Sequence, residues 1–238
     1  MQEITIKTAD MNFRTKEAYR TLRSNIEFCG DGIKVVAITS CMPNEGKTTV
    51  SLALSRFFAQ NGNRVLLIDA DMRKSVMRSH FGDQKIEYGL SNYLVGKCTA
   101  EEATCKTNED DFYVILSGPT TPSPAELLNS ERFLSLLRES KQVYDYVIVD
   151  TPPLGSVIDS AIVGKNCDGT VIVMASGEIS YRFAQSVIAQ MEMADCRILG
   201  CVLNKVAMGS GKGYYGKYYG KYYGKYYGKY YGTYGDES

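Results

Sequence analysis

The stretch Lys-Val-Val-Ala-Ile-Thr-Ser-Cys-Met-Pro-Asn-Glu-Gly-Lys-Thr-Thr, residues 34–49, joins an apolar run to a helical pattern through a loop with one glycine. Residues 34–40 predict a buried strand, and the helical pattern begins at Lys47. Residues 41–49 fit the phosphate-loop pattern, except that Cys41 replaces the first glycine. A strand before the loop and a helix after it are the context that this motif requires, so we expect a nucleotide site here.

Apolar runs like this one recur along the chain. The predicted strands are residues 34–40, 64–69, 112–116, 146–150, 169–174 and 198–203. Apolar and polar residues do not alternate within these runs, which indicates strands buried on both faces, as in parallel sheets. Helical patterns lie between them at residues 47–60, 123–142 and 180–194. The predicted fold class is therefore α/β, a doubly wound, mostly parallel sheet of the P-loop NTPase type.

The phosphate loop supplies most of the predicted nucleotide contacts. Backbone N–H groups of residues 43–48 would wrap the β-phosphate, and the helix N-terminus adds partial positive charge. Lys47 would reach the β- and γ-phosphates, and the Thr48 hydroxyl would ligate magnesium. The predicted nucleotide-binding residues of the loop are Pro43, Asn44, Glu45, Gly46, Lys47, Thr48 and Thr49.

Three aspartates follow the carboxyl ends of predicted strands, where ligands bind in such sheets. Asp150 closes the run Val-Ile-Val-Asp and resembles a Walker B aspartate, which holds magnesium directly or through water. Asp69 and Asp71 lie two residues apart just beyond another buried strand. Carboxylates so close favour a cation between them, because their charges otherwise repel each other. One of them could hold magnesium while the other takes a hydroxyl proton.

The last thirty residues, 209–238, hold eleven of the eighteen tyrosines in a repeat of Gly-Lys-Tyr-Tyr. Glycine at every fourth position and the lack of other apolar side chains predict a disordered tail. Residues 1–208 form the predicted domain. The tail is either a phosphoacceptor or a sticky segment that binds nucleic acid. The candidate acceptors are Tyr214, Tyr215, Tyr218, Tyr219, Tyr222, Tyr223, Tyr226, Tyr227, Tyr230, Tyr231 and Tyr234.

Composition narrows the possible partners and surroundings. The formal net charge is zero, so no global field favours nucleic acid or an anionic membrane. The seven cysteines are odd in number and form no Cys-x-x-Cys pair, which predicts reduced thiols and no zinc site. The sequence shows neither a signal peptide nor a long apolar run, so we expect a cytoplasmic chain unless a partner brings it to a membrane.

Four features together resemble the bacterial tyrosine kinases, or BY-kinases, and more narrowly the cytosolic kinase subunits of Gram-positive capsule and exopolysaccharide systems. These are Gly46-Lys47-Thr48, residues 68–74 (Ile-Asp-Ala-Asp-Met-Arg-Lys), residues 149–153 (Val-Asp-Thr-Pro-Pro) and the tyrosine tail. The resemblance covers essentially the whole chain. It implies ATP as the phosphoryl donor, Mg²⁺ as the cofactor and tyrosine as the acceptor, with autophosphorylation of the tail in trans.

The resemblance also assigns roles to single residues. Asp71 and Asp150 would serve magnesium together with Thr48, and Asp69 would be the base toward the incoming tyrosine. Arg73 would steady phosphate charge beside Lys47. Two residues after the last predicted strand, Asn204 and Lys205, resemble the adenine-side segment of the family.

A charged motif near the N-terminus matches the family's Glu-x-x-Arg-x-x-Arg pattern. Glu17, Arg20 and Arg23 fall on one face of a helix predicted at residues 15–28. The resemblance implies that this face contacts the next subunit of a ring, with an octamer as one possible size. It further implies a separate transmembrane activator that recruits the chain to the inner face of the cell membrane, a phosphotyrosine phosphatase and other protein substrates. Nucleic acid is not an expected partner.

Two other interpretations stay open at this point. One is an ATPase switch of the MinD/ParA type, although Cys41, Met42 and Pro43 stand where those proteins have a loop lysine. The other is a nucleotide-gated scaffold whose tail binds RNA or polysaccharide. Incubation with magnesium and ATP, followed by detection of phosphotyrosine, separates these two from a kinase.

Overall fold

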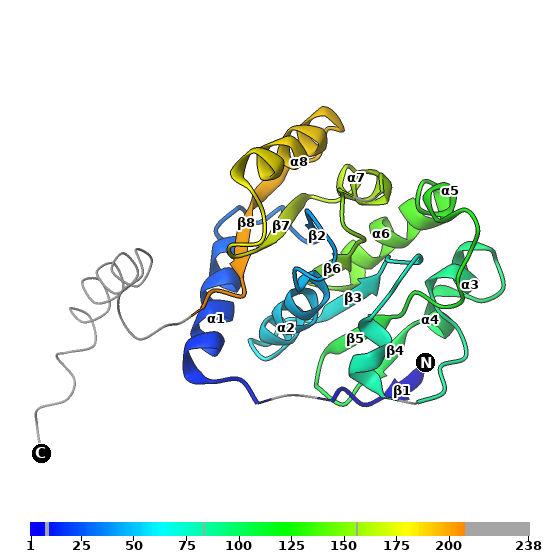
Figure 1. Cartoon of the computed structure of the whole chain (residues 1–238). Helices are drawn as coiled ribbons and strands as arrows, with labels where there is room; N and C mark the ends of the chain where they lie inside the picture. Colours follow the sequence, from blue (N-terminus) through cyan, green and yellow to red (C-terminus); the bar gives the residue numbers. More distant parts are fainter. Residues whose placement is uncertain (8–9, 83, 156, 208–238) are drawn as a thin grey trace, which may run out of the picture. The chain divides into compact units, whose positions relative to one another are not determined.

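The sheet extends to both sides of β2 (Val35–Ser40), the strand that leads into the phosphate loop. The computed structural model describes residues 1–7, 10–82, 84–155 and 157–207. Within these residues eight strands form one sheet in the order β1-β4-β5-β3-β6-β2-β7-β8 (Figure 1). All six residues of β2 are buried, because strands lie on both sides and helices cover both faces.

The sheet is parallel except at one pair, β4 and β5. The remaining strands are β1 (Gln2–Ile4), β3 (Val65–Asp69), β4 (Cys105–Thr107), β5 (Phe112–Ile115), β6 (Tyr146–Asp150), β7 (Gly169–Ala175) and β8 (Ile198–Asn204). The predicted α/β fold with a mostly parallel sheet is confirmed. The six predicted strands are all present, while β1 and β4 were not predicted because three residues carry too little pattern to recognise.

Helices cover the two faces of the sheet. They are α1 (Phe13–Glu27), α2 (Lys47–Ala59), the 3₁₀ helix η1 (Met77–Phe81), α3 (Leu90–Leu94), α4 (Ala100–Ala103), α5 (Pro124–Leu128), α6 (Glu131–Val143), α7 (Asp159–Gly164) and α8 (Tyr181–Met193). The two larger hydrophobic cores lie on opposite faces, and a third, smaller cluster includes Val187 and Met191. Val36 of β2 packs with Phe58 of α2 in one of the larger cores. The neighbouring Val35 packs with Phe133 of α6 in the other. Successive side chains of a strand point to opposite faces, so β2 contributes to both cores.

Two helix boundaries differ from the sequence prediction. The helix predicted over residues 123–142 is two helices, α5 and α6, because Ser130 caps the second and accepts a hydrogen bond from the Phe133 N–H. The N-terminal helix begins two residues before the predicted start. Its cap is Asn12, whose Oδ1 accepts from the Thr15 N–H at 2.9 Å.

One compact unit spans Met1–Asn204, and a second begins at Lys205. The predicted tail, residues 209–238, with all its candidate acceptor tyrosines, lies outside the described residues, so the predicted boundary at residue 208 stays a prediction. Within the part of the chain that the structure describes, no helix is long and apolar enough to cross a membrane.

Candidate active site

Three neighbouring strands bring the predicted site residues together. The order β3-β6-β2 is parallel throughout, so the carboxyl ends of these strands meet at one edge of the sheet. Asp69 and Asp150 are register partners at the ends of β3 and β6. The phosphate loop follows the end of β2 and leads into α2 at Lys47. The sequence prediction that these segments converge is therefore met by the topology.

The ammonium group of Lys47 lies among carboxylates. Its Nζ is 3.2 Å from Asp71 Oδ2 and 3.8 Å from Asp150 Oδ2. Lys47 is 9% exposed and Asp71 is 4% exposed, so little water screens the pair. A buried charge needs compensation, and here the lysine and the carboxylates compensate each other. Phosphate oxygens could replace these carboxylates as partners of Lys47.

Thr48 is directly linked to the aspartate of β6. Its hydroxyl donates to Asp150 Oδ2 at 2.7 Å, and the Ser51 hydroxyl lies 2.9 Å from Asp150 Oδ1. Burial raises the pKa of Asp150, while Lys47, Thr48 and Ser51 oppose that rise. Ser51 was missed by the sequence reasoning. Its spacing is the available signal, since a residue four positions after Lys47 returns to the same face of α2.

The loop is shaped by two residues with positive φ and by a buried glutamate. Asn44 has φ 65° and Gly46 has φ 89°. Glu45 is 1% exposed, and its carboxylate accepts from the Met42 N–H at 2.6 Å and the Ala175 N–H at 2.9 Å. The side chain of Glu45 therefore holds the loop from within, and only its backbone is available to a phosphate.

One predicted donor in the loop needs correction. Pro43 has no N–H group, so it cannot contribute a backbone hydrogen bond to a phosphate. The remaining N–H groups of the loop lie just before α2 or in its first turn. Backbone N–H groups in the first turn of a helix have no intrahelical partner. This part of the loop fits an anion, because the same groups carry the positive end of the helix dipole.

Asn204, at the end of β8, contacts the phosphate loop. Its Nδ2 donates to the Glu45 carbonyl oxygen at 2.9 Å. A Cβ atom added to Gly46 would lie 2.2 Å from the same Nδ2 atom. Asn204 thus packs closely on the loop and supports its shape. The adenine-side role predicted for Asn204 and Lys205 stays a prediction, and Lys205 begins the second unit.

Asp69 is enclosed by hydrogen-bond donors. It is fully buried, and its Oδ2 accepts from the Ser117 N–H at 3.2 Å and from the Ser75 hydroxyl. The Asp71 N–H lies 3.3 Å from Oδ1. Burial and the nearby Asp150 raise the pKa of Asp69 to about 7. A carboxyl group with a pKa near neutrality suits proton transfer, although a substrate must displace some of these donors to reach it.

Arg73 is held by a residue that the sequence reasoning did not single out. Its Nε and Nη2 atoms donate to the two carboxylate oxygens of Asp159 at 2.7 and 3.0 Å. Asp159 is fully buried at the start of α7, whereas the Arg73 side chain is 41% exposed. This two-pronged pair fixes the guanidinium plane. No local pattern marks Asp159, because its partner lies 86 positions away.

The predicted oligomer face of α1 is paired within its own helix. Arg20 forms an ion pair with Glu17, and Arg23 Nε lies 3.4 Å from Glu27 Oε1. The Arg20 side chain is 55% exposed. An exposed pair such as Arg20–Glu17 contributes about 0–1 kcal/mol, so Arg20 remains available to another surface. The Arg23 side chain is only 18% exposed, so it offers less of its surface than Arg20 does.

The donor set around Lys47 fits a magnesium ion delivered with a nucleotide. Among the described residues, no three His, Cys, Asp or Glu side chains are placed to hold a metal by themselves. Mg²⁺ usually binds one or two carboxylates together with waters and substrate phosphates. Thr48, Asp71 and Asp150 could complete such a set once phosphates bind to the loop.

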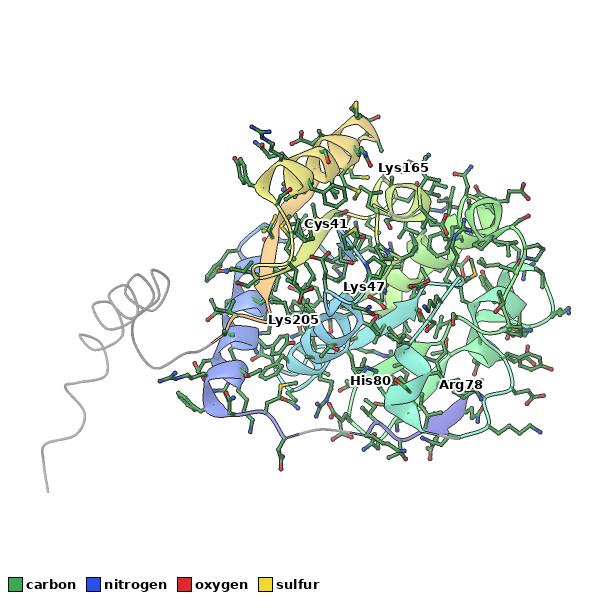
Figure 2. The ribbon with its side chains drawn as sticks, viewed as in Figure 1. Cys41, Lys47, Arg78, His80, Lys165 and Lys205 are labelled. Atoms are coloured by element: carbon green, nitrogen blue, oxygen red, sulfur yellow. The ribbon has the colours of Figure 1, made fainter. Side chains whose placement is uncertain are left out.

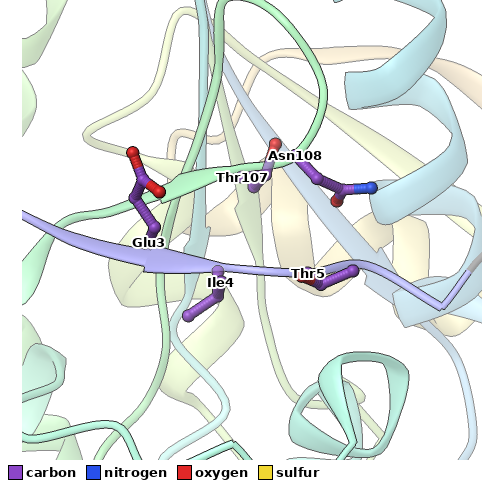
Figure 3. A pocket seen from close by; sticks show the side chains of 5 residues that line it. All are labelled: Glu3, Ile4, Thr5, Thr107 and Asn108. Atoms are coloured by element: carbon purple, nitrogen blue, oxygen red, sulfur yellow. The ribbon is translucent and has the colours of Figure 1, made fainter.

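A small cavity beside β1 has no such chemistry (Figure 3). Its volume is about 110 Å³, and Glu3 is the single carboxylate among its five lining residues. Asn108, which also lines it, accepts from the Ile6 N–H at 2.8 Å. This cavity is a shallow feature of the sheet edge and offers no ligand set for a nucleotide.

Comparison with known proteins agrees with this geometry. An AAA domain family matches residues 33–197. A tyrosine-protein kinase CpsD of Streptococcus pneumoniae is 39% identical over 218 residues, which cover 90% of this chain and 96% of the relative. The chain belongs to the bacterial tyrosine kinase family. Another relative, the tyrosine-protein kinase YwqD of Bacillus subtilis, is 40% identical and is matched over 91% of this chain and 92% of its own length.

A solved structure from the same family shows the same architecture. The kinase domain of the Escherichia coli tyrosine kinase ETK superposes with a TM-score of 0.76 at 29% identity. The match covers 89% of this chain and 94% of the ETK chain. The family suggested by the motifs around Lys47, Asp69 and Asp150 is therefore confirmed.

The close contact at Gly46 gives a testable prediction. Replacing Gly46 with alanine should weaken nucleotide binding about tenfold, because the new Cβ would push the Asn204 amide away and remove its hydrogen bond to the Glu45 carbonyl, a loss on the order of 1 kcal/mol. Gly62 is the matched control, since it also has positive φ (84°) but nothing within 4 Å of an added Cβ. Both variants carry a backbone cost of about 1–2 kcal/mol. Titration with a fluorescent nucleotide checks this, and equal affinities in the two variants would contradict it.

Proposed function

We propose that this chain is an ATP-dependent protein-tyrosine kinase that phosphorylates the tyrosine cluster of its own tail in trans. The observation that carries the proposal is the cluster of Lys47, Thr48, Asp71 and Asp150 at the carboxyl ends of β2, β3 and β6. Phosphoryl transfer depends mainly on positioning and on stabilising negative charge, and this cluster is built for both.

The residues divide the work as follows. The loop N–H groups and Lys47 would bind the phosphates. Thr48, Asp71 and Asp150 would hold Mg²⁺, which would supply neutralisation of phosphate charge. Asp69 accepts the proton of the tyrosine hydroxyl. Lys47 exchanges its carboxylate partners for phosphate oxygens when the nucleotide binds. The pair with Asp159 fixes the guanidinium plane of Arg73, and we assign to this cation the role of steadying phosphate charge.

The biological setting is part of the same proposal. The resemblance to capsule and exopolysaccharide kinases supports a role in controlling polysaccharide synthesis and export. A membrane partner would recruit and activate the chain, a phosphatase would reset the tail, and other proteins would serve as further substrates. The names of the relatives support tyrosine phosphorylation as the shared chemistry.

A mixing experiment tests transfer between subunits. A Lys47→Met chain with its natural tail serves as the acceptor, and a chain with all eleven tail tyrosines changed to phenylalanine serves as the enzyme. Phosphotyrosine should appear on the acceptor only when both proteins and magnesium-ATP are present. Phosphorylation of a wild-type tail combined with no transfer in this mixture would show that the reaction occurs within one chain.

We expect a ring-shaped oligomer that uses the exposed face of α1. Replacing Arg20 and Arg23 together with alanine should leave a monomer in multi-angle light scattering, because repeated weak pairs matter only in a closed ring. Changing Arg14 and Lys16 to alanine on the same helix is the matched control. An unchanged oligomer in the double arginine variant would refute this assignment of the face.

A further inference from the structure

A cavity of about 170 Å³ lies beyond the carboxyl end of β5. Ser117 lines it, and the N–H of the same residue donates to Asp69 Oδ2 at 3.2 Å. Ser117 therefore connects the cavity to Asp69, the carboxylate proposed as the base. The cavity lies at the same edge of the sheet as the phosphate loop, because β5, β3, β6 and β2 are parallel neighbours.

The wall of the cavity is partly apolar. Leu116 is buried in the core that lies under α2, and Ile86 packs against the same core. Tyr88 packs against the core on the other face of the sheet. An aromatic ring placed here would contact an aliphatic surface and a second ring, which is a favourable arrangement for tyrosine.

The rim of the cavity carries one charge of each sign. Arg78 on η1 and Glu87 are both exposed and both line the cavity. Figure 2 shows Arg78 on η1, apart from Lys47 in the phosphate loop. The charge of Glu87 is the largest cause of the raised pKa of the Tyr88 hydroxyl, and a hydrogen bond between the two side chains adds to it, so this carboxylate lies near that hydroxyl. The rim can therefore pair with a lysine through Glu87 and cover an aromatic face through Arg78.

The tail repeat matches these features. Each Gly-Lys-Tyr-Tyr unit supplies a lysine next to two aromatic rings, with a glycine that allows close approach to the backbone. We infer that the cavity beyond β5 is the docking site for one tail repeat, with a ring against Ile86 and Leu116 and the lysine at Glu87. This inference rests on the proposed function, since it names where the acceptor segment of that reaction is held.

The tail is long enough to reach such a site. The end of β8, the last strand before the tail, is five strands from β5, roughly 24 Å along one edge of the sheet. Tyr214 is ten residues beyond Asn204, so it reaches up to about 33 Å. The first repeat is therefore long enough to span the distance between the end of β8 and the cavity.

Charge reversal on both partners tests the docking site. The enzyme is the full chain with its eleven tail tyrosines changed to alanine, and the acceptor is the full Lys47→Met chain. Glu87→Lys in the enzyme should raise the KM for the acceptor about three- to fivefold, the scale of one exposed ion pair, without changing the KM for magnesium-ATP. When the five tail lysines of the acceptor are changed to glutamate, the order should reverse, and the Glu87→Lys enzyme should have the lower KM for that acceptor.

The control is Lys85→Glu, an exposed residue two positions away that does not line the cavity. The Lys85→Glu enzyme should show the same preference between the natural tail and the glutamate-substituted tail as the parent enzyme does. The inference is wrong if Glu87→Lys leaves the KM for the acceptor unchanged, or if both enzymes prefer the same acceptor. If the parent enzyme transfers no phosphate to any acceptor, the proposed function itself fails, and the docking site fails with it.

Discussion

Replacing Lys47 with methionine should lower tyrosine phosphorylation by at least about 10²-fold while the protein stays folded. The loss of one group that stabilises charge in a transition state typically costs 10²–10³-fold in rate. Lys47 lies 3.2 Å from Asp71 and 3.8 Å from Asp150, so it is already placed in the cluster that would surround the phosphates. Phosphotyrosine formation, measured over time, gives the rate.

Controls separate chemistry from folding in this experiment. Lys165→Met is the matched substitution, because Lys165 is exposed at the end of α7 (Figure 2). It should keep full activity. Circular dichroism should show the same helix content for both variants. A folded Lys47→Met chain with normal activity would remove the phosphate loop from the mechanism.

Asp69→Asn and Asp71→Asn should both reduce transfer strongly, but for different reasons. Asp71 lies beside Lys47 and is a proposed magnesium ligand, so its loss should weaken nucleotide binding only when magnesium is present. Asp69 is the proposed base, so its loss should lower kcat by about 10²–10⁴-fold with nucleotide affinity largely kept. Nucleotide titrations with magnesium and with EDTA, together with kcat for each variant, distinguish the two roles.

The surroundings of Asp69 supply an internal control. Ser75→Ala removes one hydrogen-bond donor from the Asp69 carboxylate but leaves the carboxylate itself. It should therefore retain far more activity than Asp69→Asn. Magnesium-dependent affinities that fall equally in the Asp69 and Asp71 variants would contradict this division of roles.

The sequence was sufficient for the features that depend on local pattern. The phosphate loop, the buried strands and the aspartates at their carboxyl ends are marked by consecutive residues, and a parallel sheet brings those ends together. The convergence of Lys47, Asp71 and Asp150 could therefore be predicted before any coordinates. The cap of α8 is Ser180, a residue type favoured at helix N-termini, and its hydroxyl accepts from the Phe183 N–H at 3.3 Å.

The features that sequence reasoning missed depend on contacts between distant segments. Asp159 binds Arg73, and Ser117 binds Asp69, but neither residue belongs to a local motif. The inward turn of Glu45 could not be foreseen either, because its partner Ala175 lies at the end of another strand. These contacts adjust the site after the topology has assembled it, so they become visible only in three dimensions.

The most direct test of the proposed kinase activity is the intact mass of the full chain after incubation with magnesium and ATP. We expect a ladder of phosphate additions with an upper limit of eleven in the tail, and peptide mapping should place them between Tyr214 and Tyr234. The ladder should be absent from the Lys47→Met chain. A wild-type chain that hydrolyses ATP but gains no phosphate on these tyrosines would contradict the account and favour an ATPase switch.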